Sequence, residues 1–309
     1  MDRRVRDDDE VIVSPTKLFR SEAGTLLVSG FIFSMDILNH LSARRFRELD
    51  DLLAFVSIYD DTRRTSAYRS MLRECADTIR GGICVEGGCG LGLFAADMAR
   101  LGAQKVYAVE QNPILASLAR ARFDRLPKNI SSRIELVELP LQRFRPPVHV
   151  NVLVHEFYGQ LLYDEDLRVL DHLKFRPDHV LPDGGELRAG VLSSHVYQDK
   201  IVTPEAIGKL DGVLVSGLFE GEPGDLRKPV LRWKFGRGLS EVKHDFRREK
   251  GDLVCLGLVV TNKGKQVCRA GQSSNWSYVW TKRAGNEMGF RFRKGEPGMG
   301  MECRFVWKR

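Results

Sequence analysis

The sequence predicts two parts, an α/β domain with a doubly wound parallel sheet and, after it, a β-rich domain. The first part is predicted by a glycine cluster between a short apolar strand and a helix. A second strand follows that helix, which makes a βαβ unit at 83–110. The second part is predicted by short alternating apolar runs, bounded by glycine, proline or lysine, that begin after Leu187. A chain of 309 residues is long enough for both parts.

The α/β domain is expected to cover residues 42–182, after an N-terminal extension formed by residues 1–41. Between 42 and 80, apolar residues recur every three and four positions, which predicts helices ahead of the sheet. The elements expected after them are a strand at 83–85, a helix at 93–100, a strand at 106–109, a helix at 112–126, strands at 133–139 and 149–156, and a helix at 168–175.

The β-rich domain is expected to cover residues 183–309, with the joint in the turn-forming segment 181–186. Its pattern is typical of a β-barrel or a sandwich. The predicted strands are 188–197, 228–235, 252–261, 277–283, 288–294 and 301–307.

Composition indicates a soluble globular protein, because 43% of the residues are hydrophobic and 29% are charged. The apolar stretch 25–41 is interrupted by polar residues and is too broken for the about 20 apolar residues that a membrane helix needs, so no membrane partner is expected. The six cysteines are scattered without a Cys-x-x-Cys pair, which predicts neither a disulfide framework nor a metal site. We therefore expect a reduced intracellular protein in the cytoplasm, with the nucleus as a second location.

The net charge of +7 leaves the kind of partner open. The basic excess is visible at 230–239 and 290–309. Such an excess is either a solvated surface or a contact surface for an acidic partner or RNA. No nucleic-acid recognition motif accompanies it, so RNA binding stays an alternative.

The glycine cluster predicts a site for a nucleoside-containing cofactor. Gly88, Gly90 and Gly92 follow the first strand, where a backbone without Cβ atoms can turn tightly and approach a ligand. Glu110 ends the second strand, 18 residues after Gly92, where an acidic side chain commonly binds ribose hydroxyls. The spacing is Gly-x-Gly-x-Gly rather than the Gly-x-Gly-x-x-Gly of dinucleotide sites, which favours S-adenosylmethionine.

Two glutamates stand out in the segment VHEFYGQLLYDED at 154–166. Glu156 and Glu165 are nine residues apart. They either face each other and bind a cation or are two ordinary charges on a turn, and the spacing alone leaves both interpretations open.

Four segments in the same order resemble the protein arginine methyltransferases. They are the Asp-x-x-Arg-Thr-x-x-Tyr pattern at 61–68, the glycine unit at 83–110, the double-glutamate segment at 155–165 and the joint at 175–187. The resemblance is dense from about residue 49 to residue 191 and thin beyond. It implies a Rossmann-like S-adenosylmethionine-dependent methyltransferase domain followed by a β-barrel, with a dimerisation arm inserted in the barrel.

The resemblance also implies roles for individual residues. Arg64 would pair with the donor's carboxylate, the glycines would face the donor, and Glu110 would bind its ribose. Glu156 and Glu165 would clamp the guanidinium of a substrate arginine, so that a nitrogen lone pair faces the sulfonium methyl. The full set implied for S-adenosyl-L-methionine is Arg64, Glu86, Gly88, Gly90, Gly92 and Glu110. Protein substrates rich in Gly-Arg are implied as well.

The chain departs from the family pattern at the donor. The aspartate that starts the family's glycine motif is Glu86 here, one methylene longer. The acidic residue expected beside adenine is Gln142 or Arg143, depending on the alignment. The family's Tyr-Phe-x-x-Tyr falls on 45–49, RFREL, where both tyrosines are missing.

It departs at the clamp too. In the family's Thr-His-Trp loop, here 274–276, Asn275 replaces a histidine, and an amide can neither carry charge nor move a proton. Within the double-glutamate segment, Trp-Met has become Phe157 and Tyr158, and the preceding serine is His155. A histidine there could pair with a glutamate, or it could be a satisfied side chain.

The leading hypothesis from these departures is a non-catalytic or strongly impaired arginine methyltransferase subunit, a prozyme. It would associate with a catalytic arginine methyltransferase paralogue and activate or stabilise it. The dimerisation arm expected at 197–225 looks short, which suits docking on a different partner. One alternative is an active arginine methyltransferase that uses Glu156 and Glu165, and another is an RNA-associated interaction protein.

Overall fold

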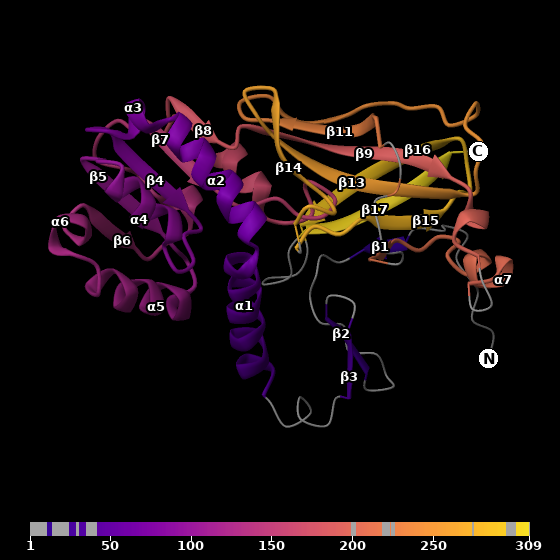
Figure 1. The fold of residues 1–309 in the computed structure, drawn as a ribbon, viewed down its shortest axis with the longest axis horizontal. Helices are drawn as coiled ribbons and strands as arrows, with labels where there is room; N and C mark the ends of the chain where they lie inside the picture. Colours follow the sequence, from indigo (N-terminus) through magenta and orange to yellow (C-terminus); the bar gives the residue numbers. More distant parts are fainter. Residues whose placement is uncertain are drawn as a thin grey trace.

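The chain folds around a parallel sheet and a set of antiparallel sheets, with helices α1 and α2 between them in the view of Figure 1. This computed structural model describes residues 11–13, 25–28, 31–34, 42–198, 202–217, 223, 226–273, 275–294 and 301–308. Most of the predicted N-terminal extension, parts of the predicted arm at 197–225, and Ser274 lie outside the described residues.

The parallel sheet has the strand order β6-β5-β4-β7-β8, and every neighbouring pair in it is parallel. Its strands are β4 (Ile83–Gly87), β5 (Lys105–Val109), β6 (Ile134–Val137), β7 (Val152–His155) and β8 (His179–Leu181). The order reverses between β4 and β7, and ligands of such sheets bind at the carboxyl ends of the strands at this point. The register sets Gly87 beside Val109 and His155. The glycine turn, Glu110 and Glu156 therefore meet at one edge.

Helices cover this sheet and lead into it. They are α1 (Ala43–Asp60), α2 (Thr62–Glu74), α3 (Ala76–Ile79), α4 (Leu93–Arg100), α5 (Pro113–Asp124) and α6 (Lys128–Ser131), with 3-10 helices η2 (Leu141–Arg143) and η3 (Asp166–His172). Asp61 separates α1 from α2, because its carboxylate accepts a hydrogen bond from the Arg64 N–H at 2.9 Å and caps α2. Asn112 caps α5 in the same way, with Pro113 in the first turn.

The C-terminal part consists of antiparallel strands. The larger sheet has the order β10-β15-β13-β9-β11-β12, with β14 paired to β13. Its strands are β9 (Gly184–Leu192), β10 (Val215–Ser216), β11 (Lys228–Lys234), β12 (Gly238–Glu241), β13 (Leu253–Asn262), β14 (Lys265–Arg269) and β15 (Val279–Lys282). A second sheet joins β1 (Val11–Val13), β17 (Met301–Lys308) and β16 (Glu287–Lys294), and β2 (Thr25–Val28) pairs with β3 (Phe31–Ser34). The expected arm holds α7 (Pro204–Gly208) and β10.

Among the described residues, the strand pairings of the β-rich part form antiparallel sheets and trace no closed barrel. The structure corrects two of the expected elements. The strand expected at 188–197 ends at Leu192, and a 3-10 helix η4 (Ser194–Val196) follows it. The helix expected at 168–175 is the 3-10 helix η3. The helix expected at 93–100 is confirmed as α4.

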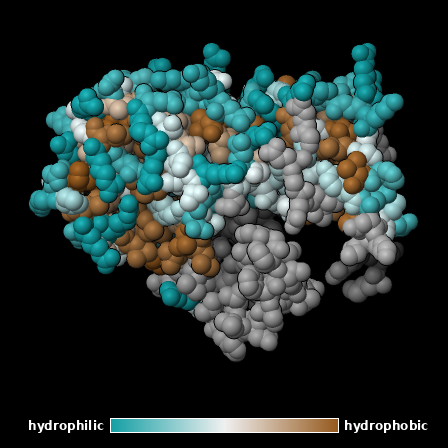
Figure 2. Space-filling model, viewed as in Figure 1, coloured by the Kyte–Doolittle hydropathy of each residue, from teal (hydrophilic) through white to brown (hydrophobic). Residues whose placement is uncertain are grey.

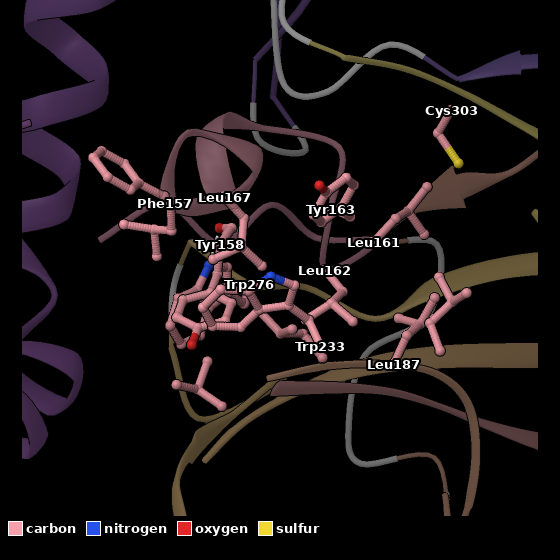
Figure 3. Close-up of a cluster of buried hydrophobic side chains, with 14 of the residues drawn as sticks. Phe157, Tyr158, Leu161, Leu162, Tyr163, Leu167, Leu187, Trp233, Trp276 and Cys303 are labelled. Carbon is pink, nitrogen blue, oxygen red and sulfur yellow. Dashed lines mark hydrogen bonds between the residues drawn. The ribbon is translucent and has the colours of Figure 1, made fainter. Parts of the chain in front are cut away.

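The segment between the two glutamates is part of the hydrophobic core. Tyr158, Leu161 and Leu162 are almost completely buried and belong to one cluster with Trp233 and Trp276 from the β-rich part. Figure 3 shows these side chains interleaved where the segment meets the antiparallel sheet. The backbone that carries Glu156 and Glu165 is therefore held by side chains from both parts of the chain.

None of the helices in the described part of the chain is long and apolar enough to cross a bilayer. Within the same residues, no group of three or more His, Cys, Asp and Glu side chains could hold a metal ion.

Leu161→Ala tests the packing of this segment. The leucine is 1% exposed, so its truncation should lower the free energy of unfolding by about 2–5 kcal/mol. Leu118→Ala, at a residue that is 40% exposed, is the matched control and should change it by less than about 0.5 kcal/mol. Urea denaturation followed by tryptophan fluorescence gives both values, and equal losses would contradict the assignment of the segment to the core.

Candidate functional site at the glycine turn

The glycine turn is packed against aromatic rings. Gly88, Gly90 and Gly92 all have left-handed backbones, with φ of 60°, 53° and 71°, a conformation that glycine adopts without steric cost. A Cβ atom on Gly88 would stand 2.5 Å from a ring carbon of Phe157. On Gly90 it would stand 2.1 Å from the ring of Phe55. The space that these two glycines leave is therefore filled by side chains of the same protein.

The third glycine makes a contact of the same kind with α5. A Cβ atom on Gly92 would stand 2.1 Å from the ring of Phe123. The neighbouring Arg122 donates from Nη1 to the carbonyl oxygens of Leu91 and Gly92, at 2.9 and 2.6 Å. The α5 helix thus holds the carbonyl side of the turn.

The two glutamates of the predicted donor site are bound to backbone N–H groups. Glu110 accepts from Gly90 through Oε2 and from Asn112 through Oε1, both at 2.8 Å. Glu86 accepts from the first turn of α4, at Phe94 N (3.1 Å) and Ala95 N (2.6 Å). Burial raises the pKa of Glu86 to about 8, although these two N–H groups act in the opposite direction. The longer side chain of glutamate here caps a helix.

Helix α1 supplies two contacts that sequence reasoning missed. The Tyr59 hydroxyl donates to the carbonyl of Cys89 at 3.3 Å and accepts from the N–H of Leu91 at 3.0 Å. Phe55 lies one helical turn earlier and covers Gly90. The only signal in the sequence was this four-residue spacing of two aromatics in a predicted helix, which does not say what the helix contacts.

Arg64 and Glu156 form a buried ion pair. Arg64 Nη1 lies 3.2 Å from Glu156 Oε1, and the guanidinium also lies 5.3 Å from the centre of the Trp276 ring. Burial raises the pKa of Glu156, and Arg64 opposes that shift. Arg64 Nη2 and the hydroxyl of Tyr68 are buried without a hydrogen-bond partner. This end of the site therefore keeps unmet hydrogen-bonding capacity.

The second glutamate belongs to the same electrostatic group. Burial raises the pKa of Glu165 well above its ordinary value, the Asp164 and Glu156 carboxylates raise it further, and Arg64 lowers it. The Asp164 carboxylate folds back and accepts from the N–H of Leu161 at 2.9 Å, close against Gly159. The structure thus brings Glu156, Glu165 and Arg64 into one partly buried cluster of charges.

The substituted residues beside the clamp make structural contacts. His155 is buried, its Nε2 lies 2.9 Å from the carbonyl of Pro182, and burial lowers its pKa to about 4. It therefore bonds to the backbone and not to a glutamate. The amide of Asn275 accepts from the Ser57 hydroxyl at 2.8 Å and donates to the Ser57 carbonyl at 3.1 Å. This pair ties the β-rich part to α1.

The predicted adenine position lies on η2. Gln142 is half-buried there and Arg143 is exposed, so neither brings a carboxylate to the site. The neighbouring Leu141 packs under Gly87, where a Cβ atom would stand 2.6 Å from its Cδ2.

Three features define the fold as Rossmann-like and of the methyltransferase type. They are the strand order of the parallel sheet, the glycine turn after β4 and the acidic residue Glu110 after β5. No protein-family model matches the chain. Among curated proteins, it is 28% identical over 141 residues to protein arginine N-methyltransferase 6 of Danio rerio, covering 45% of this chain and 39% of that protein. It is 31% identical over 127 residues to protein arginine N-methyltransferase 1 of Schizosaccharomyces pombe, covering 40% of this chain and 36% of that protein. The chain thus aligns with less than two-fifths of these relatives' length.

Solved structures of arginine methyltransferases share the fold over most of the chain. A crystal structure of PRMT6 with SAH superposes with a TM-score of 0.62 at 14% identity, covering 83% of this chain and 100% of that one. The Trypanosoma brucei PRMT1 enzyme–prozyme heterotetramer with AdoHcy gives 0.59 at 15% identity, covering 82% and 92%. These likenesses show a Rossmann-like methyltransferase domain joined to a β-domain of the barrel type. Sequence relatives and structure neighbours together support the protein arginine methyltransferase family.

S-Adenosylmethionine, which the resemblance implies, fits one end of this site and not the other. Arg64 has a buried N–H group without a partner, which suits a donor carboxylate. At the glycine turn, however, the rings of Phe157 and Phe55 occupy the faces of Gly88 and Gly90, and both oxygens of Glu110 accept backbone N–H groups. As arranged, these residues do not accommodate the donor, and no methyl-transfer step follows from them.

Glu156→Gln tests the buried ion pair. The amide keeps the shape of the side chain but leaves the Arg64 charge unpaired. The free energy of unfolding should fall by about 3 kcal/mol, the lower end for breaking a buried pair, because the Trp276 ring still faces the guanidinium. Glu135→Gln removes the exposed Lys105–Glu135 pair as a control and should cost less than about 1 kcal/mol. If denaturant unfolding showed the same loss of free energy in both variants, the buried ion pair between Arg64 and Glu156 would be contradicted.

His155→Gln tests the buried neutral histidine. Its folded pKa of about 4 lies below the ordinary 6.5, so the unfolded chain binds the proton first as the pH falls. The histidine thus contributes stability above pH 6.5 that is lost between pH 6.5 and 4, about 3 kcal/mol in all. The free energy of unfolding of both proteins is measured across this range. The difference in this free energy between wild type and variant should become smaller as the pH falls. A gap independent of pH would mean that His155 is accessible to protons in the folded state.

Proposed function

We propose that this chain is a non-catalytic or strongly impaired protein arginine methyltransferase subunit that associates with a catalytic paralogue and activates or stabilises it. The observation that carries the proposal is the packed glycine turn. Phe157 and Phe55 cover Gly88 and Gly90, and each carboxylate oxygen of Glu110 already accepts one backbone N–H group. A donor could bind there only if the two rings moved first, although each Glu110 oxygen keeps a second lone pair.

The loss of methyl-transfer rate is expected to be large, because several preorganised groups are affected together. A single electrostatic contact aimed at a transition state is worth about 10²–10³ in rate. Asn275, in place of the family's histidine, is engaged with Ser57 and cannot move a proton. The scaffold itself is intact, since the segment carrying Glu156 and Glu165 is packed into the core. A retained scaffold with a filled donor site suits a subunit whose function is association.

A structure neighbour supports the association part of the proposal. The Trypanosoma brucei protein of this fold was solved as an enzyme–prozyme heterotetramer. In an analogous complex the catalytic partner would bind S-adenosyl-L-methionine and act on Gly-Arg-rich proteins, and this chain would contribute surface and stability. We place such a complex in the cytoplasm, with the nucleus as a second location.

An active methyltransferase is the second candidate, and one observation favours it. Arg64, Glu156 and Glu165 are retained together, and Arg64 Nη2 and Tyr68 Oη have unmet hydrogen bonds next to them. Activity would require α1 to withdraw Phe55 from Gly90. A chain that did so unaided would bind the donor without a partner.

The decisive experiment compares the chain alone, each catalytic arginine methyltransferase of the same organism alone, and each mixture. We expect no saturable binding of S-adenosylhomocysteine by the isolated chain in calorimetry. We also expect no methylation of a Gly-Arg-rich peptide by it, but several-fold more methylation by one mixture than by that enzyme alone. Stoichiometric binding together with turnover by the isolated chain, lost in Glu156→Gln, would establish the active enzyme instead. RNA binding that falls steeply with salt, without any effect on the enzymes, would favour the RNA-associated protein.

A further inference from the structure

Two loops of the parallel-sheet part carry the same short pattern. Residues 143–146 read Arg-Phe-Arg-Pro, and residues 174–177 read Lys-Phe-Arg-Pro. The first segment leads into β7 and the second into β8, which are parallel neighbours in the sheet. In each segment the phenylalanine is withdrawn from solvent, while the basic residue on either side of it is exposed. Each loop therefore buries one ring and exposes two cations.

The structure places the two loops side by side. The rings of Phe144 and Phe175 meet edge to face, with their centres 5.8 Å apart. A few residues further on, the N–H of Asp178 donates to the carbonyl of Val150 at 3.2 Å, and the Asp178 carboxylate lies 2.8 Å from His149 Nε2. The four cations next to the two rings therefore form one group, which we name the four-cation patch. Its members are Arg143, Arg145, Lys174 and Arg176.

The two rings hold the patch on the sheet face that lies opposite α4. The Phe144 ring packs on Tyr107 of β5, with centres 5.4 Å apart, and both belong to the cluster that contains Val85 of β4. The preceding residue, Cys84, belongs to the other cluster, which contains the buried side chains of α4. Successive residues of a strand point to opposite faces, so the loops cover the face that α4 does not cover. The backbone that carries the four cations is therefore fixed by packing.

The patch has no acidic partner of its own. In the part of the chain that the structure describes, none of its four side chains takes part in an ion pair or a side-chain hydrogen bond. The carboxylates nearest to the second loop in sequence are engaged elsewhere. Asp171 accepts from the Tyr163 hydroxyl at 2.7 Å, and Asp178 pairs with His149. Four like charges in one group repel one another, and a bound anion would relieve that repulsion.

The basic segment at 230–239 is different, although its excess of positive charge is plain in the sequence. Arg232 Nε lies 2.9 Å from Glu186 Oε1, and Lys234 Nζ lies 2.6 Å from Asp183 Oδ2. These two cations are already neutralised by carboxylates of the same protein. A net charge of +7 therefore does not by itself leave cations unpaired.

We infer that the four-cation patch binds the phosphate backbone of a nucleic acid, an inference that does not depend on the proposed function. Three of its four members are arginines, whose planar guanidinium can donate two parallel hydrogen bonds to phosphate oxygens. Unpaired cations on a rigid base supply the electrostatic attraction that dominates such binding. Contacts to phosphates carry no sequence information, so the binding is expected to be independent of base sequence.

A protein partner would require a different surface. Interfaces between proteins have an apolar centre with a polar rim, whereas both rings of the patch are packed into or against the core cluster and its exposed side chains are cations. Figure 2 shows the contrasting case, a gathering of hydrophobic side chains over α5 in the lower left of the view. Helix α5 packs into the cluster on the other face of the sheet, so that apolar region is separate from the patch. An acidic protein segment is therefore treated as an outcome of the test.

Two quadruple variants of the full-length chain test the inference. The patch variant replaces all four members of the four-cation patch by glutamine. The control variant replaces three arginines and one lysine that are also exposed and unpaired among the described residues but belong to separate parts of the chain, so both variants lose the same charge. Affinity for a labelled single-stranded RNA of mixed sequence is measured by fluorescence anisotropy between about 50 and about 200 mM salt. The control substitutions are Arg73→Gln, Arg125→Gln, Arg248→Gln and Lys265→Gln.

We expect the patch variant to bind the RNA at least about tenfold more weakly at the lower salt concentration. Its plot of log affinity against log salt should be flatter by about 3, because each phosphate contact on a single strand contributes about 0.7. The control variant should stay within about threefold of wild type, because salt screens distant charges. The thermal midpoint of the patch variant should equal or exceed that of wild type, since only exposed side chains change and their repulsion is removed. Competition by single-stranded DNA of the same sequence and by a DNA duplex shows which nucleic acid the chain prefers.

Three results would overturn the inference. The first is that the wild-type chain binds neither RNA nor DNA at the lower salt concentration. The second is an equal loss of affinity in the patch variant and the control variant, which would mean that net charge alone attracts the RNA. The third is displacement of the RNA by polyglutamate at equal charge concentration, which would assign the patch to an acidic protein segment. Stimulation of a catalytic enzyme by the wild-type chain tests the proposed function separately, so the two proposals fail by different measurements.

Discussion

The packing of three aromatic rings against a left-handed glycine turn is the constraint on which the rest of the site depends. Each ring approaches closer than any Cβ atom would allow, so the turn must be glycine at Gly88, Gly90 and Gly92 even without a ligand. The rings come from three places, the segment after β7, helix α1 and helix α5. The turn therefore joins elements that lie far apart in the sequence. A motif that in related folds leaves room for a cofactor here organises the packing of the protein itself.

Electrostatics follow the same pattern of internal satisfaction. The Glu86 carboxylate accepts N–H groups at the start of α4, where the helix dipole also favours negative charge. Glu110 accepts two further N–H groups, and Glu156 pairs with Arg64. Among the described residues of the site, hydrogen-bonding capacity remains unmet at Arg64 Nη2 and Tyr68 Oη, and also at Glu156 Oε1 and His155 Nδ1. Of the acidic residues that the family resemblance assigned to ligands, Glu86, Glu110 and Glu156 therefore make contacts within this fold.

The parts of this architecture that could be predicted from the sequence are those that depend on local residue patterns. The glycine unit is set by the change from a strand period to a helix period within a few residues, and α4 begins and ends where that pattern predicts. The pairing of Glu156 with Arg64 was not predicted, because the resemblance assigned Arg64 to the donor's carboxylate and Glu156 to a substrate guanidinium, and the two residues are far apart in the chain. The contact of Phe55 with Gly90 could not be predicted, because it depends on the angle at which α1 leaves α2 at Asp61. The same is true of β1, which pairs with β17 at the other end of the sequence.

Closure of the predicted barrel is a further feature that local sequence patterns do not decide. Alternating apolar runs fix which face of each strand is buried, but they do not fix whether the first and last strands meet. Here β13, buried along most of its length, is the centre of the larger sheet, while β16 and β17 form a separate sheet with β1. The side chains between these sheets include Trp233 and Trp276, which also hold the segment between Glu156 and Glu165. The β-rich part thus acts on the site through packing, because the same side chains bury the segment that carries the two glutamates.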